Sequence, residues 1–210
     1  MADLPFQLPA PLDGQLAAAA DVEGKLPRVL ESLGPLAGRD VLLLDVPDGA
    51  FLRRLREAGI DPELAPLEAP LRIPRPDASL DALVTLWTGF RGVDAADLAE
   101  ADRVLRPGGR LLVVHDYGRD DVSSLRSADA PEYGAWSRRD GPFLHGGGYR
   151  LRVVHCFWTF DTIETAGAFL AAGFGAPGAA LADRMKRPRL SWNVAVYHRW
   201  RGGVDPAAGA

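Results

Sequence analysis

The stretch His115-Asp116-Tyr117 places three side chains able to transfer or share a proton directly after an apolar run. Histidine is the commonest general base near neutral pH, and a neighbouring carboxylate or phenol can orient the group that it deprotonates. We therefore predict that His115 takes a proton from a hydroxyl group and that Asp116 or Tyr117 orients it. A structural interpretation stays open, in which His115 is a hydrogen-bonded strand-end residue and Asp116 caps the following turn.

The segments around these residues alternate between apolar runs and amphipathic stretches. Short, almost wholly apolar runs at 40–46, 80–87 and 110–115 are typical of parallel strands buried on both faces. Helical spacing over 49–58 and 94–105, with Asp94 as N-cap, separates them. This order predicts a doubly wound, mostly parallel α/β sheet, in which ligands bind beyond the carboxyl ends of the central strands. The predicted binding edge therefore comprises 45–49, 86–88 and 115–117.

The rest of the chain is expected to complete one α/β domain over residues 15–200. Residues 1–14 are predicted to be an extended arm and residues 201–210 a flexible tail. The other predicted elements are a helix in two pieces over 15–36, a turn at 106–109, loop and short helix over 119–148, a strand over 149–160, a helix over 162–172 that Gly173 closes, and a final strand over 190–200.

Composition excludes several classes of function. The formal net charge of the 210 residues is −4, and basic and acidic residues are interspersed, which argues against a nucleic-acid partner. The basic run 184–189 is the exception, and we interpret it as a solvated loop. The single cysteine, Cys156, excludes an internal disulfide and a multi-cysteine zinc site, and its apolar neighbours indicate a buried, inert thiol. Without a signal peptide or an apolar run near the roughly 20 residues of a membrane helix, we expect a cytoplasmic protein with no membrane partner.

Four stretches resemble class I S-adenosylmethionine-dependent methyltransferases. "EADRVLRPGGRLLVV" (100–114) resembles the helix, turn and strand that follow that family's fourth strand, and "PRPDASLDALVTLW" (74–87) resembles the segment leading into it. "LLLDV" (42–46) resembles the first strand, and "SWNVAVYHRW" (191–200) the antiparallel last strand. The resemblance covers roughly residues 25–200. It implies a Rossmann-like methyltransferase fold, S-adenosylmethionine as cofactor, and methyl transfer to a small molecule that the sequence does not identify.

The resemblance also implies cofactor-binding residues. The first loop, "DVPDG", keeps the acidic residue and a glycine of the family pattern, Asp45 and Gly49. Pro47 and Asp48 depart from that pattern, and the loop is about two residues short. Asp48 can pair with the cofactor's ammonium group or cap the helix that follows. The acidic residue that binds ribose would be Asp61 or Glu63, and Glu68-Ala69 would lie near adenine. The implied cofactor-binding residues are Asp45, Val46, Asp48, Gly49, Asp61, Glu68, Leu86 and Trp87.

The largest departure from the family is the crossover between its second and fourth strands. Only some twenty residues separate Gly59 from Leu80, and five of them are prolines, so a long helix does not fit. We predict a shortened crossover without its helix. The alternative function is therefore a non-catalytic, methyltransferase-like binding or interaction protein that has lost the cofactor. A nicotinamide-dependent dehydrogenase fits worse, because no G-x-G-x-x-G follows the first strand.

The segment 129–160 is expected to form the substrate wall, with Tyr133 and Trp136 lining an apolar pocket and Arg138 or Arg139 binding a carboxylate. The scattered histidines do not have the spacing of a metal site, so we predict none. A homodimer through an edge strand or the N-terminal helix is a further expectation.

Overall fold

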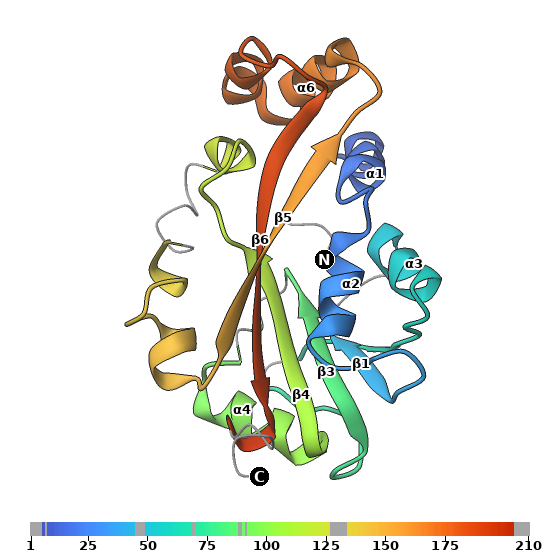
Figure 1. Ribbon diagram of the computed structural model, residues 1–210, viewed down its shortest axis with the longest axis vertical. Helices are drawn as coiled ribbons and strands as arrows, with labels where there is room; N and C mark the ends of the chain where they lie inside the picture. Colours follow the sequence, from blue (N-terminus) through green and yellow to red (C-terminus); the bar gives the residue numbers. More distant parts are fainter. Residues whose placement is uncertain are drawn as a thin grey trace.

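A six-stranded mixed sheet forms the centre of the molecule (Figure 1). The computed structural model describes residue 6 and residues 8–44, 49–68, 70–87, 90, 92–126 and 134–203. The strands lie in the order β2-β1-β3-β4-β6-β5, with β2, β1, β3 and β4 parallel and β6 antiparallel to both β4 and β5. The strands are β1 (Val41–Leu44), β2 (Glu63–Ala65), β3 (Leu80–Leu86), β4 (Leu105–Asp116), β5 (Arg150–Thr159) and β6 (Arg189–Trp200). The doubly wound, mostly parallel fold with an antiparallel last strand is confirmed.

Both faces of the sheet are covered, because alternate residues of each central strand enter two separate cores. One core, on the α1–α3 face, contains Leu43, Val84 and Val114, and the other, on the α4 face, contains Leu42, Leu83 and Val113. The helices are α1 (Ala10–Ala19), α2 (Lys25–Ser32), α3 (Ala50–Glu57), α4 (Ala95–Val104) and α6 (Ile163–Ala182), with short turns η1 (Val122–Leu125), η2 (Pro142–Gly146) and η3 (Arg201–Gly203).

Two local predictions need correction. Helix α1 begins at Ala10 after Pro9, so residues 10–14 are helical and not part of an extended arm. The segment 106–109 was expected to be a turn, but β4 begins at Leu105 and runs through it. The register with β3 shifts between Leu80 and Ala82, and Gly108 has a φ of +81°, so these residues form a bulge within the strand.

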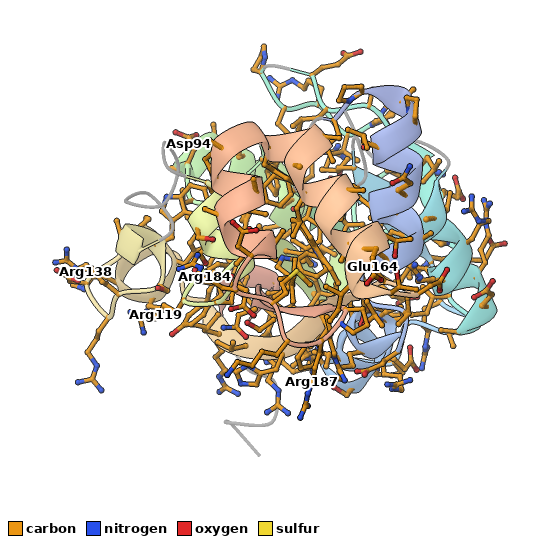
Figure 2. All side chains as sticks on the ribbon, turned by 90° about the horizontal axis from the view of Figure 1, so that it is seen from above. Asp94, Arg119, Arg138, Glu164, Arg184 and Arg187 are labelled. Atoms are coloured by element: carbon orange, nitrogen blue, oxygen red, sulfur yellow. The ribbon has the colours of Figure 1, made fainter. Side chains whose placement is uncertain are left out.

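Helix α6 lies beyond one end of the sheet, between β5 and β6 (Figure 1). The Thr162 hydroxyl accepts from Thr165 N, which caps the first turn of the helix. The helix continues past Gly173, but Gly175 has non-helical dihedral angles and divides α6 into two segments, seen side by side in Figure 2. By length and composition α6 could cross a membrane. Because each segment is shorter than the roughly 20 residues needed and Phe169 is buried in the core, α6 packs as part of this domain.

The close approach of the two α6 segments gives a stability prediction. A Cβ at Gly178 would overlap the main-chain carbonyl of Leu170, so Gly178→Ala is expected to destabilise the protein by about 1–3 kcal/mol. Gly167→Ala is the matched control, since its Cβ would meet only Ala182 Cβ at 3.6 Å and alanine favours a helix. Urea unfolding should separate the two variants, and equal stabilities would show that the segments do not pack this closely.

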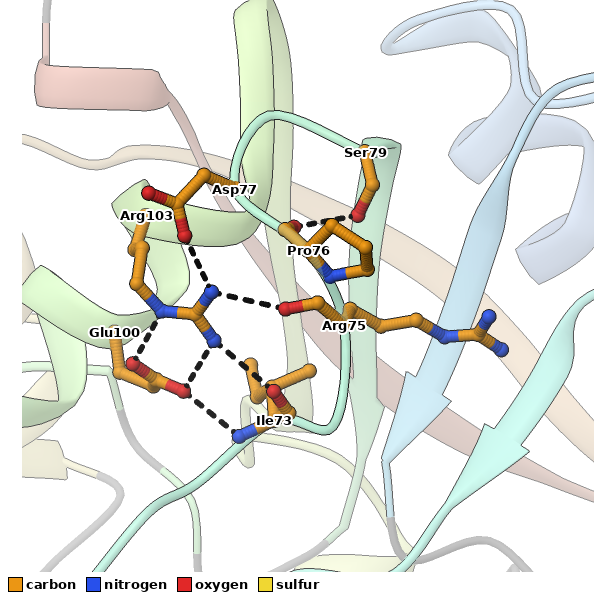
Figure 3. Close-up of polar contacts among 7 residues, drawn as sticks. All are labelled: Ile73, Arg75, Pro76, Asp77, Ser79, Glu100 and Arg103. Atoms are coloured by element: carbon orange, nitrogen blue, oxygen red, sulfur yellow. Dashed lines mark hydrogen bonds and ion pairs between the residues drawn. The ribbon is translucent and has the colours of Figure 1, made fainter.

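The crossover from β2 to β3 contains no helix among its described residues, as predicted. Leu71 and Ile73 bury their side chains in the core on the α4 face in place of a helix. Glu100 and Arg103 of α4 fasten this segment (Figure 3). The Arg103 guanidinium donates to the carbonyls of Ile73 (3.0 Å) and Arg75 (2.9 Å), and Glu100 Oε1 accepts from Ile73 N at 2.8 Å. We call Glu100 and Arg103 the crossover clamp.

Candidate functional site

Three parallel strands end at one edge of the sheet. The register pairs Leu44 of β1 with Thr85 of β3, and Leu86 of β3 with Val114 of β4, so the residues that follow these strands are neighbours. The edge thus gathers Leu86, Trp87 and the stretch 115–117, with Gly49 preceding α3. The predicted residues Asp45, Val46, Asp48 and Tyr133 lie outside the described residues.

His115 and Asp116 point to opposite faces of β4, because neighbouring residues of a strand alternate. His115 lies on the α4 face, where its ring centroid is 5.1 Å from that of Trp136, and Asp116 lies on the α1–α3 face, where it contacts Trp192. The prediction that Asp116 orients the same group as His115 is therefore not supported by the geometry.

Asp116 belongs to a buried polar cluster. Its carboxylate accepts a hydrogen bond from Trp192 Nε1 at 2.9 Å and forms an ion pair with Arg126 Nε at 3.0 Å. The Asp116 side chain is 4% exposed and the Arg126 side chain 6% exposed. The Arg126 guanidinium also lies 3.9 Å from the centre of the Phe6 ring. Asp116 is thus committed to fixing the loop after β4 onto β6. Arg126 lies in a segment without periodicity, so no local sequence signal predicts its role, and Trp192 is predictable only as part of the last strand.

His115 is 2% exposed and surrounded by aromatic rings. Phe143 lies 6.2 Å from it between ring centroids, and Phe143 stacks on Tyr197 at 3.9 Å. Burial raises the pKa of the Tyr197 phenol above its ordinary value of 10.0. The structure therefore brings His115 together with Trp136, one of the predicted substrate-wall residues, in a largely apolar environment.

The other two predicted polar groups on this side are already engaged. The Tyr117 hydroxyl accepts from Arg119 Nη1 at 3.1 Å. Arg138 is exposed and forms two hydrogen bonds with Asp140, at 2.7 and 3.0 Å, which raises the pKa of the guanidinium and lowers that of the carboxyl. A substrate carboxylate would have to displace Asp140 to reach Arg138.

Trp87 follows β3 in an unusual backbone conformation. Its φ of 53° lies in the left-handed region that bulky residues avoid, and such strain is often found at functional sites. Its ring lies 5.4 Å from that of Trp192, which Asp116 holds. The Leu86 side chain is fully buried, so only its main chain is available to a ligand.

The prediction that Asp61 follows the second strand is wrong. Strand β2 begins only at Glu63, so Asp61 lies at the amino end of the sheet, opposite the candidate site, and pairs with Arg56 at 3.0 Å. Glu63 is the first residue of β2 and pairs with Arg75. Glu68 is the acidic residue that follows the carboxyl end of β2, and it is exposed. It lines a hollow of about 570 Å³ together with the crossover clamp and not with Gly49, Trp87 or His115.

No protein-family model and no curated protein matches this sequence. Solved structures do resemble it. A protein assigned as a methyltransferase of an antibiotic biosynthesis pathway in Anabaena variabilis is 12% identical, covers 87% of this chain and 98% of its own, and superimposes with a TM-score of 0.54. One assigned as a type II methyltransferase from Anaeromyxobacter dehalogenans is 17% identical, with coverages of 82% and 94% and a TM-score of 0.47.

The sheet order, the antiparallel last strand and the Anabaena variabilis likeness define the class of fold. The chain has the fold of class I S-adenosylmethionine-dependent methyltransferases, as the four sequence stretches indicated.

Proposed function

We propose that this protein binds S-adenosylmethionine at the carboxyl edge of β1, β2 and β3 and transfers its methyl group to a small molecule. The observation that carries the proposal is the combination of this fold with a ligand-accessible acidic residue, Glu68, and a strained aromatic residue, Trp87, at the edge where doubly wound sheets bind ligands.

The residues at this edge fit such a cofactor. Gly49 precedes α3 without a side-chain cap, so the first N–H groups of the helix suit a carboxylate. Glu68 is an acceptor suited to the two hydroxyls of a ribose, and we assign it that role in place of Asp61. The Trp87 ring can attract a sulfonium through its π face. The cofactor would supply an activated methyl group.

His115 is the proposed base for an acceptor hydroxyl. Because the donor is already activated, most of the rate enhancement comes from holding donor and acceptor together, and a base is needed only where the acceptor carries a proton. Trp136 and Phe143, packed around His115, would exclude water from the acceptor. Asp116 acts as a positioning residue for the Trp87 ring, because its carboxylate holds Trp192 and the Trp192 ring contacts that of Trp87.

The assignment of the ribose site is tested by a matched pair of substitutions. Glu68→Gln is expected to weaken S-adenosylmethionine binding by about tenfold, because two hydrogen bonds to a charged acceptor become weaker ones. Asp61→Asn removes an equal charge at the opposite end of the sheet and should leave the affinity unchanged. Calorimetric titration measures both, and an effect of Asp61→Asn as large as that of Glu68→Gln would refute the assignment.

The second candidate function is a binding or interaction protein without catalysis. It is favoured by the crossover between β2 and β3, whose described residues form no helix where the family that the sequence resembles walls the adenosine pocket. Titration with S-adenosylmethionine and with its demethylated product decides between the two functions. Micromolar binding would support the enzyme and justify a screen of acceptors, with His115→Asn as the variant expected to lose transfer but keep binding. No binding at millimolar ligand would support the interaction protein.

A further inference from the structure

The basic run 184–189 connects α6 to β6 and forms one wall of a hollow of about 570 Å³. Residues 120, 121 and 124, at η1, form the opposite wall. Figure 2 views the molecule from the end that carries α6 and labels Arg184 and Arg187 there. The hollow has the size of a small-molecule site, and none of its lining residues is among those assigned to methyl transfer.

Three of the four basic side chains in this wall lack a carboxylate partner within the described part of the chain. Arg189 is neutralised, since it pairs with Glu23 at 2.6 Å and covers the Phe157 ring at 3.4 Å. The ion pairs found among the described residues include none from Arg184, Lys186 or Arg187. In a chain with a net charge of −4, three unpaired cations around one hollow are a local excess of positive charge.

The two carboxylates of the opposite wall are held by other donors. Asp120 accepts from Ser123 N at 2.8 Å and Asn193 N at 2.6 Å, and Asp121 accepts from Ser191 N at 2.8 Å. These hydrogen bonds fasten the loop after β4 to β6 and partly compensate both negative charges. Among the described residues neither carboxylate forms an ion pair with Arg184, Lys186 or Arg187, so the three cations outnumber the two carboxylates of the hollow by one.

The remaining lining of the hollow is apolar. Leu181 and Leu190 are buried beneath it, and Met185 is half-buried. Arg184 Nε donates to the carbonyl of Ala180 at 3.1 Å, which fixes the guanidinium at the rim and leaves its terminal nitrogens available. A ligand that fits this lining has an anionic group for the rim and an apolar body for the floor.

We propose that this hollow, the α6–β6 basic hollow, binds a phosphate monoester with an apolar organic group. Two arginines and a lysine match a phosphate dianion, because guanidinium forks bind phosphate oxygens in pairs and several cations suit two negative charges. The hollow does not depend on the cofactor or on methyl transfer, so its test can fail or succeed separately from the proposed function.

The test is a titration of the isotope-labelled protein with phenyl phosphate, in the absence of S-adenosylmethionine. Two-dimensional NMR spectra monitor the amide signals at each phenyl phosphate concentration. Phenyl phosphate is expected to shift the amide signals of residues 120–124 and 181–190 and to bind about tenfold more tightly than inorganic phosphate or benzyl alcohol, each of which offers only half of the recognised chemistry. Added salt should weaken the binding.

The contribution of the rim charges is tested with a matched pair of double variants. Lys186→Gln/Arg187→Gln removes two rim charges whose side chains make no hydrogen bond to another described residue, and it should raise the dissociation constant about tenfold. Arg53→Gln/Arg152→Gln removes two exposed charges from α3 and β5 and should change it less than about twofold. The proposal is overturned if both double variants act equally, if the shifted signals lie elsewhere, or if inorganic phosphate or benzyl alcohol binds as tightly as phenyl phosphate.

Discussion

Replacing Asp116 by alanine is expected to lower the free energy of unfolding by about 3–5 kcal/mol, because the change leaves the buried Arg126 guanidinium without its counter-charge. It also deprives Trp192 Nε1 of its acceptor at 2.9 Å. Urea unfolding at pH 7, followed by tryptophan fluorescence, measures the loss. The same variant should alter the fluorescence of the folded protein, since Trp192 packs on Trp87 and Trp158.

An exposed ion pair provides the control for this prediction. Asp140→Ala removes the carboxylate partner of Arg138 on the surface and should leave stability almost unchanged, because water solvates the exposed Arg138 guanidinium in its place. Asp116→Asn should fall between the two variants, since it keeps an acceptor for Trp192 but loses the charge. A loss in Asp116→Ala no larger than that in Asp140→Ala would show that the cluster at the end of β4 does not stabilise the fold.

Glu100→Gln is expected to destabilise the protein by about 3 kcal/mol at neutral pH and by clearly less in acid. The hydrogen bond and charge of Arg103, with the Ile73 amide, lower the pKa of the Glu100 carboxyl from 4.5 to about 2, and only 8% of the side chain is exposed. Because the folded-state pKa is depressed, this stabilisation is complete above pH 4.5 and is lost as the pH falls through 2. Urea unfolding of the native and variant proteins at pH 7 and pH 3 measures the change.

The matched control for the crossover clamp is Glu57→Gln, which removes a carboxylate from the exposed side of α3 and should change stability little at either pH. A difference between native and Glu100→Gln proteins that stays constant from pH 7 to pH 3 would contradict the depressed pKa. Arg103→Met should lower the free energy of unfolding at pH 7 as Glu100→Gln does. The substitution removes the partner of the Glu100 carboxylate and also leaves the carbonyls of Ile73 and Arg75 without their donor.

The sequence predicted the central strands because 40–46, 80–87 and 110–115 are short apolar runs that are typical of strands buried on both faces. These runs, the N-cap Asp94 and the proline-rich stretch before Leu80 are local signals, and local signals suffice to place elements and to exclude a long crossover helix. Errors arose where one residue decides a boundary. Pro9 starts a helix that composition suggested was an arm, and the glycines at 108 and 109 allow a bulge where a turn was expected.

The candidate site was predictable as an edge but not as a set of contacts. His115, Trp87 and Gly49 follow from the ends of elements, whereas the roles of Asp116 and Asp61 do not. Asp61 was misplaced because β2 begins only two residues after it, which reverses the end of the sheet at which it lies. Asp116 forms an ion pair with Arg126 and a hydrogen bond with Trp192, which lies 76 residues further along the chain. No spacing in the sequence predicts such a contact.

The sequence by itself therefore determined the class of fold, the order of strands and helices, and the edge of the sheet that carries the candidate site. Only the tertiary structure decided which side chains share that edge, which of them are held in ion pairs, and that the basic run 184–189 faces a hollow with an apolar floor. The physical reason is that periodicity and turn residues act over a few neighbours, whereas charge pairing and burial depend on segments that meet only after the chain has folded.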